Sequence, residues 1–145
     1  MSSLKKNFLM LVLVSATALA QAGTAITLYK NAGCSCCEAY IAYLKTAGFT
    51  VKAENADDMG AIRQRYGSAN AASCHTMRIA GYTVEGHVPV AAIKQLLQKK
   101  PAITGISVPG MPANSPGMGE EKPGTLPVYA LKTANGQPAT EFGRF

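Results

Sequence analysis

Residues 26–44 read ITLYKNAGCSCCEAYIAYL and join a strand pattern to a helix pattern. The first four of these residues alternate branched and large side chains, as short strands do. Over residues 36–47, apolar side chains recur at spacings of three and four, which predicts an amphipathic helix. Three cysteines therefore lie where a strand leads into a helix: Cys34, Cys36 and Cys37.

The following residues continue this alternation of strands and helices. A second strand is predicted over residues 49–53, and a second helix over 57–67 begins with two aspartates and ends at a glycine. Two extended runs follow at 77–80 and 82–85, and a proline opens the last helix over 89–100. The order βαβαββα predicts an α/β fold. With a cysteine cluster after the first strand, it predicts a thioredoxin-like sheet with helices on both faces.

Residues 101–127 differ from the rest because they contain six prolines among several glycines. Such a segment inside a compact domain is usually either functional or a connector, so we expect a long loop here. The chain then ends in a predicted β-hairpin, in which strands 128–132 and 139–142 are joined by an Asn135-Gly136 turn.

The N-terminal segment has the pattern of an export signal. Two lysines, Lys5 and Lys6, precede an apolar run over residues 8–18, and small residues suit cleavage after Ala20 or Ala22. The run is near half of the roughly 20 apolar residues that a membrane-spanning helix needs. A cleaved signal is therefore favoured over a retained membrane anchor.

We accordingly expect a signal peptide over residues 1–22 and a single mature domain over 23–145, located in the periplasm without membrane contact. A chain of 145 residues leaves room for one domain. Removal of the two lysines lowers the net charge from +6 to +4. The remaining basic residues are scattered, without the dense run that phosphate backbones attract, so nucleic acid is not an expected partner.

The four cysteines allow three hypotheses, of which the first is structural disulfides. Oxidising compartments favour such bonds. However, the adjacent Cys36 and Cys37 bridge each other only with strain, and at most one member of the cluster reaches Cys74 easily. The second hypothesis is a thiol-disulfide oxidoreductase, in which Cys34 attacks a substrate and Cys37 resolves the mixed disulfide. The third thiol, Cys36, would compete as a resolving group.

The third hypothesis is a metal site. In a thioredoxin-like sheet, the loop that bears Cys74 faces the first helix, so all four sulfurs would converge. Soft thiolates select Cu(I), zinc or iron-sulfur clusters. Zinc usually takes paired C-x-x-C units with wider spacing. An iron-sulfur cluster suits an exported chain less well, so Cu(I) is favoured.

Two histidines and two methionines are further candidate ligands: His75, His87, Met111 and Met118. Imidazole and thioether both suit copper. Each residue also has a structural alternative, since His75 could orient its loop, His87 could cap the last helix, and methionines often fill gaps in a core.

The chain resembles the CopG-type periplasmic copper-resistance proteins, a family long classed as a domain of unknown function. The resemblance covers nearly all of the mature chain and is carried by short motifs: CSCC at 34–37, SCHT at 73–76, Gly81-Tyr82, VEGHVP at 84–89, VPGMP at 108–112 and SPGM at 115–118. One departure is Ser35, where many relatives have glycine. Because a serine side chain can turn to solvent there, it should not alter ligation.

The resemblance implies a thioredoxin-like fold and a thiolate-bridged cluster of more than one copper ion on Cys34, Cys36, Cys37 and Cys74. It also implies a role in copper tolerance alongside periplasmic copper-handling or efflux proteins, and it raises redox exchange between Cu(I) and Cu(II) as an activity. We therefore expect a Cu(I)-binding protein, with the thiol-disulfide oxidoreductase as the alternative.

Overall fold

The computed structural model describes residues 23–131 and 138–145. The predicted signal peptide and the predicted Asn135-Gly136 turn lie outside the described residues. None of the helices in the described part of the chain has the length and apolar run needed to span a membrane.

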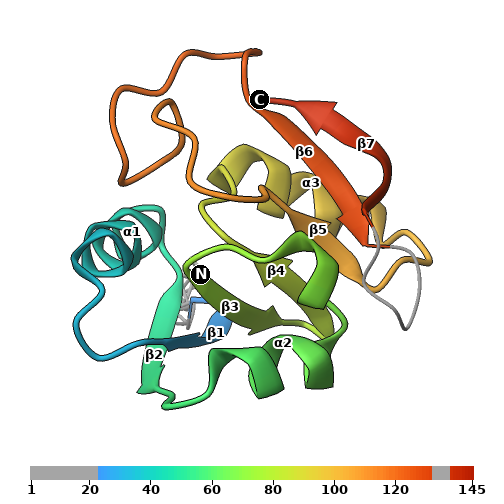
Figure 1. Cartoon of the computed structure of the whole chain (residues 1–145). Coiled ribbons are helices and arrows are strands. Elements are labelled where there is room, and N and C mark those ends of the chain that lie inside the picture. Colours follow the sequence, from blue (N-terminus) through green and yellow to red (C-terminus); the bar gives the residue numbers. More distant parts are fainter. Residues whose placement is uncertain (1–22, 132–137) are drawn as a thin grey trace, which may run out of the picture.

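The strands of the described part form one mixed sheet in the order β2-β1-β3-β4-β5-β6-β7 (Figure 1). Parallel pairing joins β1 to β2 and β4 to β5, and the other neighbours are antiparallel. The strands are β1 Ala25–Lys30, β2 Thr50–Asn55, β3 His75–Ile79, β4 Tyr82–Glu85, β5 Gly105–Ser107, β6 Pro127–Leu131 and β7 Pro138–Arg144.

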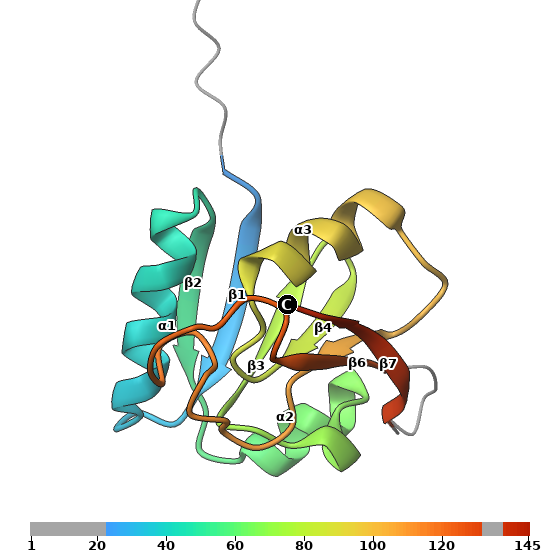
Figure 2. The same ribbon diagram turned by 90° about the horizontal axis from the view of Figure 1, so that it is seen from above.

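Three α-helices of the described part pack against this sheet: α1 Ser35–Thr46, α2 Met59–Tyr66 and α3 Val90–Lys99. The buried aliphatic and aromatic side chains of α1 and α3 share one apolar core with Ile26 and Leu28 of β1. The neighbouring Tyr29 points to the opposite face, because side chains alternate along a strand. There it stacks on Tyr66 of α2, which lies well away from α1 and α3 in Figure 2. The predicted α/β class is confirmed.

Local sequence explains the ends of the helices. Asp58 precedes α2 and its carboxylate accepts a hydrogen bond from the Ala61 amide at 2.9 Å, while Gly67 ends the helix in the left-handed conformation. Helix α3 begins at Val90, one residue later than predicted, with Pro89 at its N-cap. Helix α1 begins at Ser35, one residue earlier than predicted, with Cys34 at its N-cap.

The segment 101–127, predicted as a loop throughout, contains the short strand β5. This strand has three residues, all buried, and it inserts between β4 and β6. Three residues among prolines and glycines are too few to show a periodic pattern, so residue spacing could not predict this strand. The predicted C-terminal hairpin is confirmed by antiparallel pairing of β6 with β7.

Candidate metal centre

The turn before α1 places the first three cysteines. The amide of Cys34 donates to the carbonyl of Asn31 at 3.2 Å and closes the turn. The ammonium of the buried Lys30 lies 3.4 Å from the Ala32 carbonyl and forms an ion pair with Glu38 at 2.7 Å. A cation at the end of β1 thus ties the turn to the first turn of the helix.

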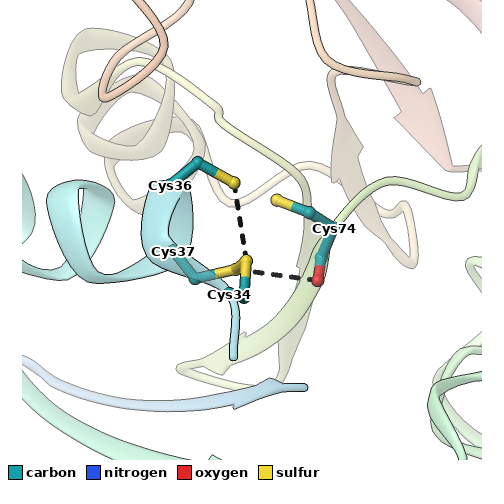
Figure 3. A group of neighbouring side chains, drawn as sticks. All are labelled: Cys34, Cys36, Cys37 and Cys74. Atoms are coloured by element: carbon teal, nitrogen blue, oxygen red, sulfur yellow. Dashed lines mark hydrogen bonds between the residues drawn. A yellow bond between two sulfur atoms is a disulfide. The ribbon is translucent and has the colours of Figure 1, made fainter. Parts of the chain in front are cut away.

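Cys34 and Cys37 form a disulfide, while Cys36 and Cys74 are free thiols (Figure 3). Four thiolates are therefore present only after this bond is reduced. In the bonded state, the Sγ atom of Cys36 lies 3.4 Å from that of Cys34, and the Cys74 thiol points toward that of Cys36.

The four sulfur atoms lie within 4.8 Å of one another. Three of them come from α1 and its N-cap, and the fourth comes from the loop before β3. Because β3 pairs with β1 in antiparallel orientation, this loop lies beside the end of β1 and so beside the N-terminus of α1. The predicted convergence of Cys74 with the other three cysteines is therefore observed.

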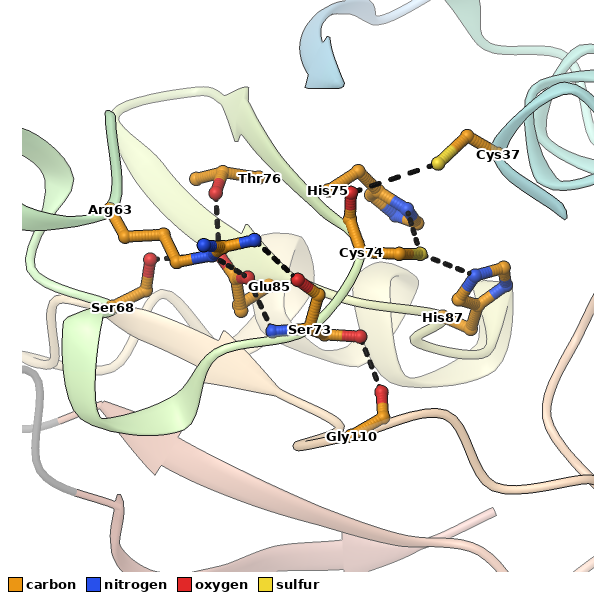
Figure 4. A network of polar contacts seen from close by, with 10 residues as sticks. All are labelled: Cys37, Arg63, Ser68, Ser73, Cys74, His75, Thr76, Glu85, His87 and Gly110. Carbon is orange, nitrogen blue, oxygen red and sulfur yellow. Dashed lines mark hydrogen bonds and ion pairs between the residues drawn. The ribbon is translucent and has the colours of Figure 1, made fainter. Parts of the chain in front are cut away.

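A buried ion pair holds the Cys74 loop (Figure 4). Arg63 of α2 donates from Nε to the Glu85 carboxylate at 3.1 Å and from Nη2 to the Ser73 carbonyl at 2.5 Å. The same carboxylate accepts hydrogen bonds from the Ser73 amide at 2.8 Å, from Thr76 at 2.6 Å and from Ser68 at 2.8 Å. Burial nevertheless raises the pKa of Glu85, because the charge has left water.

Two fully buried histidines, His75 and His87, contact the Cys74 thiol. The Sγ atom lies 2.8 Å from Nε2 of His87 and 3.2 Å from Nδ1 of His75. Nδ1 of His87 lies 2.6 Å from the Pro116 carbonyl, which can only accept, so we assign the imidazole proton to Nδ1. The lone pair on Nε2 then faces Cys74, and the ring of Tyr40 stacks on His75.

Burial determines the protonation states of His75, His87 and Cys74. It lowers the pKa of His75 to about 3 and also lowers the pKa of His87, so both rings are neutral at pH 7. Burial, together with the neighbouring Cys36, raises the pKa of Cys74 to about 12. Two neutral imidazoles and a thiol could bind a metal ion here, provided that the thiol loses its proton.

Alkylation of Cys74 in the disulfide form is expected to be slow near neutral pH and to rise about tenfold per pH unit until the pH approaches the thiol pKa of about 12, because the thiolate is the nucleophile. Mass spectrometry of peptides after timed iodoacetamide treatment measures the rate at each pH. A rate for Cys74 that levels off below pH 9 would contradict the raised pKa.

The loop after β5 covers the same site. The amide of Gly110 donates to the Ala72 carbonyl at 3.1 Å, and the Ser73 hydroxyl donates to the Gly110 carbonyl. Within this loop, the Met111 side chain is 55% exposed and Met118 is half-buried. Ligation by these two methionines stays a prediction.

Sequence reasoning missed the residues that support the site. The predicted helix over 57–67 contains Arg63 and the predicted strand over 82–85 contains Glu85. No residue spacing, however, indicates that these two side chains, 22 positions apart, form an ion pair. The one available sign of a buried charge was the position of Glu85, which ends a strand whose other three residues are apolar, aromatic or β-branched.

The fold and these contacts define the class: a mixed α/β protein with a cysteine and histidine cluster that could bind metal. A family model described as "Protein of unknown function, DUF411" matches residues 71–118. Two similar solved structures are described as copper resistance protein CopG, Form 1 and Form 2. They are 38% and 37% identical to this chain, with TM-scores of 0.71 and 0.72, and each match covers 83% of this chain and 98% of the other. No curated protein matches. The chain belongs to the CopG family of copper resistance proteins.

Proposed function

We propose that this chain is a periplasmic copper-resistance protein that holds more than one Cu(I) ion as a thiolate-bridged cluster on Cys34, Cys36, Cys37 and Cys74. The observation that carries the proposal is the convergence of four sulfur atoms within 4.8 Å. The two similar structures, described as copper resistance proteins, support copper as the metal.

Bridging follows from the number of sulfurs. Thiolates are soft ligands and favour Cu(I). Since each Cu(I) takes two or three sulfurs, four thiolates hold at most two ions without sharing, and they hold more than two ions, or two three-coordinate ions, only if thiolates bridge. Reduction of the Cys34–Cys37 bond comes first, because a disulfide sulfur carries no charge to bind the metal.

The finer fold assignment supports the same function. We propose a thioredoxin-like core made of the first four strands, since their order β2-β1-β3-β4 places the β1–α1 junction beside the start of β3. Cys74 directly precedes β3, at the position where thioredoxins have a cis-proline, and so it faces the N-terminus of α1. Export by the signal over residues 1–22 would deliver this core to the periplasm, where copper-handling or efflux proteins are the expected partners.

Copper uptake by the reduced protein tests the proposal. After reduction with dithiothreitol and its removal without oxygen, titration with Cu(I) against a competing chelator is expected to load more than one ion per chain, measured by elemental analysis. Chains alkylated at all four cysteines serve as the control and should bind none specifically. A reduced protein that binds one ion or none would sink the proposed cluster.

The Cys34–Cys37 disulfide favours a second candidate, a thiol-disulfide oxidoreductase. A dithiol at a helix N-terminus is suited to exchange, because the positive helix end stabilises the thiolate. Turnover of insulin or glutathione disulfide that survives both Cys36→Ser and Cys74→Ser would support it. Absence of turnover by the unaltered chain would remove it.

A further inference from the structure

Two thiols stay free when the Cys34–Cys37 bond is closed, and both belong to cysteines that are partly exposed. We propose that Cys36 and Cys74 are a second redox-active dithiol, which disulfides of small thiols oxidise to a bond between α1 and the loop before β3. This reaction needs no metal. It also differs from the oxidoreductase candidate, in which Cys34 and Cys37 react and the other two cysteines are dispensable.

The sulfur atoms of Cys36 and Cys74 are already close. They lie within 4.8 Å of each other, and Figure 3 shows the two thiols pointing toward each other. A disulfide bond is about 2.0 Å long, so closure needs the sulfurs to approach by less than about 3 Å. Each sulfur turns about its own Cα–Cβ bond among staggered positions, so a change of rotamer can close this gap.

The backbone beside both cysteines is held in place. Cys36 lies in the first turn of α1. Next to Cys74, the Ser73 amide donates to the Glu85 carboxylate at 2.8 Å, and the Ser73 carbonyl accepts a hydrogen bond from Arg63. Because the two thiols are held near each other, their reaction is intramolecular and loses little freedom of motion.

Cys36 is the available partner for Cys74. Cys34 and Cys37 are bonded to each other, and Cys37 is fully buried, so an external disulfide does not reach its sulfur. The Cys36 sulfur also lies 3.4 Å from that of Cys34. Attack at Cys34 would move the first disulfide to Cys34 and Cys36 and would free Cys37. This exchange is the competing reaction that the test has to separate.

The oxidation proceeds through two thiol-disulfide exchanges. The Cys36 thiolate attacks one sulfur of the external disulfide, releases the first small thiol and keeps the other half as a mixed disulfide. The Cys74 sulfur then attacks the Cys36 sulfur and releases the second small thiol. Two cysteine thiols are oxidised and one external disulfide is reduced, and the two thiol protons leave on the two released thiols.

The burial of Cys74 sets the order of the two steps. It raises the pKa of Cys74 to about 12, so this thiol is protonated at neutral pH and is the poorer nucleophile toward a disulfide in solution. Cys36 therefore attacks first. In the second step the attack is intramolecular, and proximity offsets the small fraction of Cys74 thiolate.

Closure of the second bond removes the last thiols of the chain. With both disulfides formed, none of its four cysteines keeps a thiol, and reduction restores them. Because a disulfide sulfur carries no charge to bind a metal, the number of thiolate ligands then depends on the disulfides around the protein.

The test uses the metal-free mature chain with the Cys34–Cys37 bond closed, and oxidised glutathione as the external disulfide. After acid quenching, the intact mass is expected to fall by two hydrogens, with no glutathione attached. Trypsin should then leave the peptide 31–45, which holds three cysteines, joined to the peptide 66–78, which holds Cys74. Fragmentation of the joined peptides identifies the partner of Cys74, which should be Cys36.

Variants separate the two steps. Cys74→Ser should stop at a mixed disulfide of Cys36 with glutathione, because the sulfur that attacks in the second step is absent. Cys36→Ser should leave Cys74 as a free thiol and give no joined peptides. Ser35→Ala changes the neighbouring residue without removing a sulfur, so it is the control and should close as the unaltered chain does. If a cysteine variant fails to fold, the joined peptides of the unaltered chain still decide the question.

Four results would overturn the inference. They are thiols that persist in the folded chain under excess oxidised glutathione, a lasting mixed disulfide on Cys36 of the unaltered chain, a bond from Cys74 to Cys34 or Cys37, and transfer of the first disulfide to Cys34 and Cys36. Because the test contains no metal, each of these results leaves the proposed function standing if the reduced protein loads more than one Cu(I).

Discussion

Replacing Cys74 with serine is expected to abolish binding of more than one Cu(I) by the reduced protein. The remaining thiols all come from Cys34 and the first turn of α1, so the cluster loses the one sulfur supplied from the opposite loop. Without it, no thiolate bridges the helix to the β3 loop. Affinity for any remaining ion should fall at least about 100-fold, since loss of an outer-sphere partner alone can cost that much.

Anaerobic titration against a Cu(I) chelator, followed by elemental analysis, measures both the number of Cu(I) ions bound per chain and their affinity. Ser35→Ala is the matched control, because it alters a neighbouring residue of the motif without removing a thiol, and it should load copper as the unaltered chain does. Equal stoichiometry and affinity for Cys74→Ser and the unaltered protein would show that the fourth sulfur is not a ligand.

Glu85→Ala is expected to lower the free energy of unfolding by about 3–5 kcal/mol, as removal of one partner of a buried ion pair does. The Glu85 side chain is fully buried, and its loss strands Arg63, the Ser73 amide and two hydroxyl groups. Because these contacts hold the Cys74 loop, copper affinity of the folded variant should also fall by about 10–100-fold.

Urea denaturation of the metal-free protein measures the first effect. Glu141→Ala is the control, since its ion pair with Arg144 is exposed and is worth less than about 1 kcal/mol. Glu85→Gln keeps the shape of the side chain and most of its hydrogen bonds, so its loss in free energy of unfolding should lie between those of Glu85→Ala and Glu141→Ala. A change of under 1 kcal/mol for Glu85→Ala would mean that the buried pair does not hold this loop.

The local part of the site could be predicted from the sequence. Alternation in residues 26–29 and helical spacing after Cys36 place the CSCC motif at a strand-to-helix junction, because both patterns depend on neighbours along the chain. The approach of Cys74 to the other three cysteines could also be predicted, because the order of strands and helices indicates a sheet in which β3 pairs with β1.

The supporting contacts could not be predicted. Arg63 and Glu85 meet only because α2 packs on the sheet beside β4, and Pro116 meets His87 only because the long loop folds back. Such contacts depend on tertiary packing, which residue spacing does not encode. The redox state of Cys34 and Cys37 likewise depends on the reducing agents around the protein rather than on the motif.

X-ray absorption at the copper edge, on reduced protein loaded with Cu(I) without oxygen, tests the thiolate cluster most directly. Sulfur-dominated scattering with a short copper-copper vector is expected, because bridging thiolates bring metal ions close together. Copper bound mainly by nitrogen or oxygen, with no copper-copper vector, would contradict the four-cysteine centre.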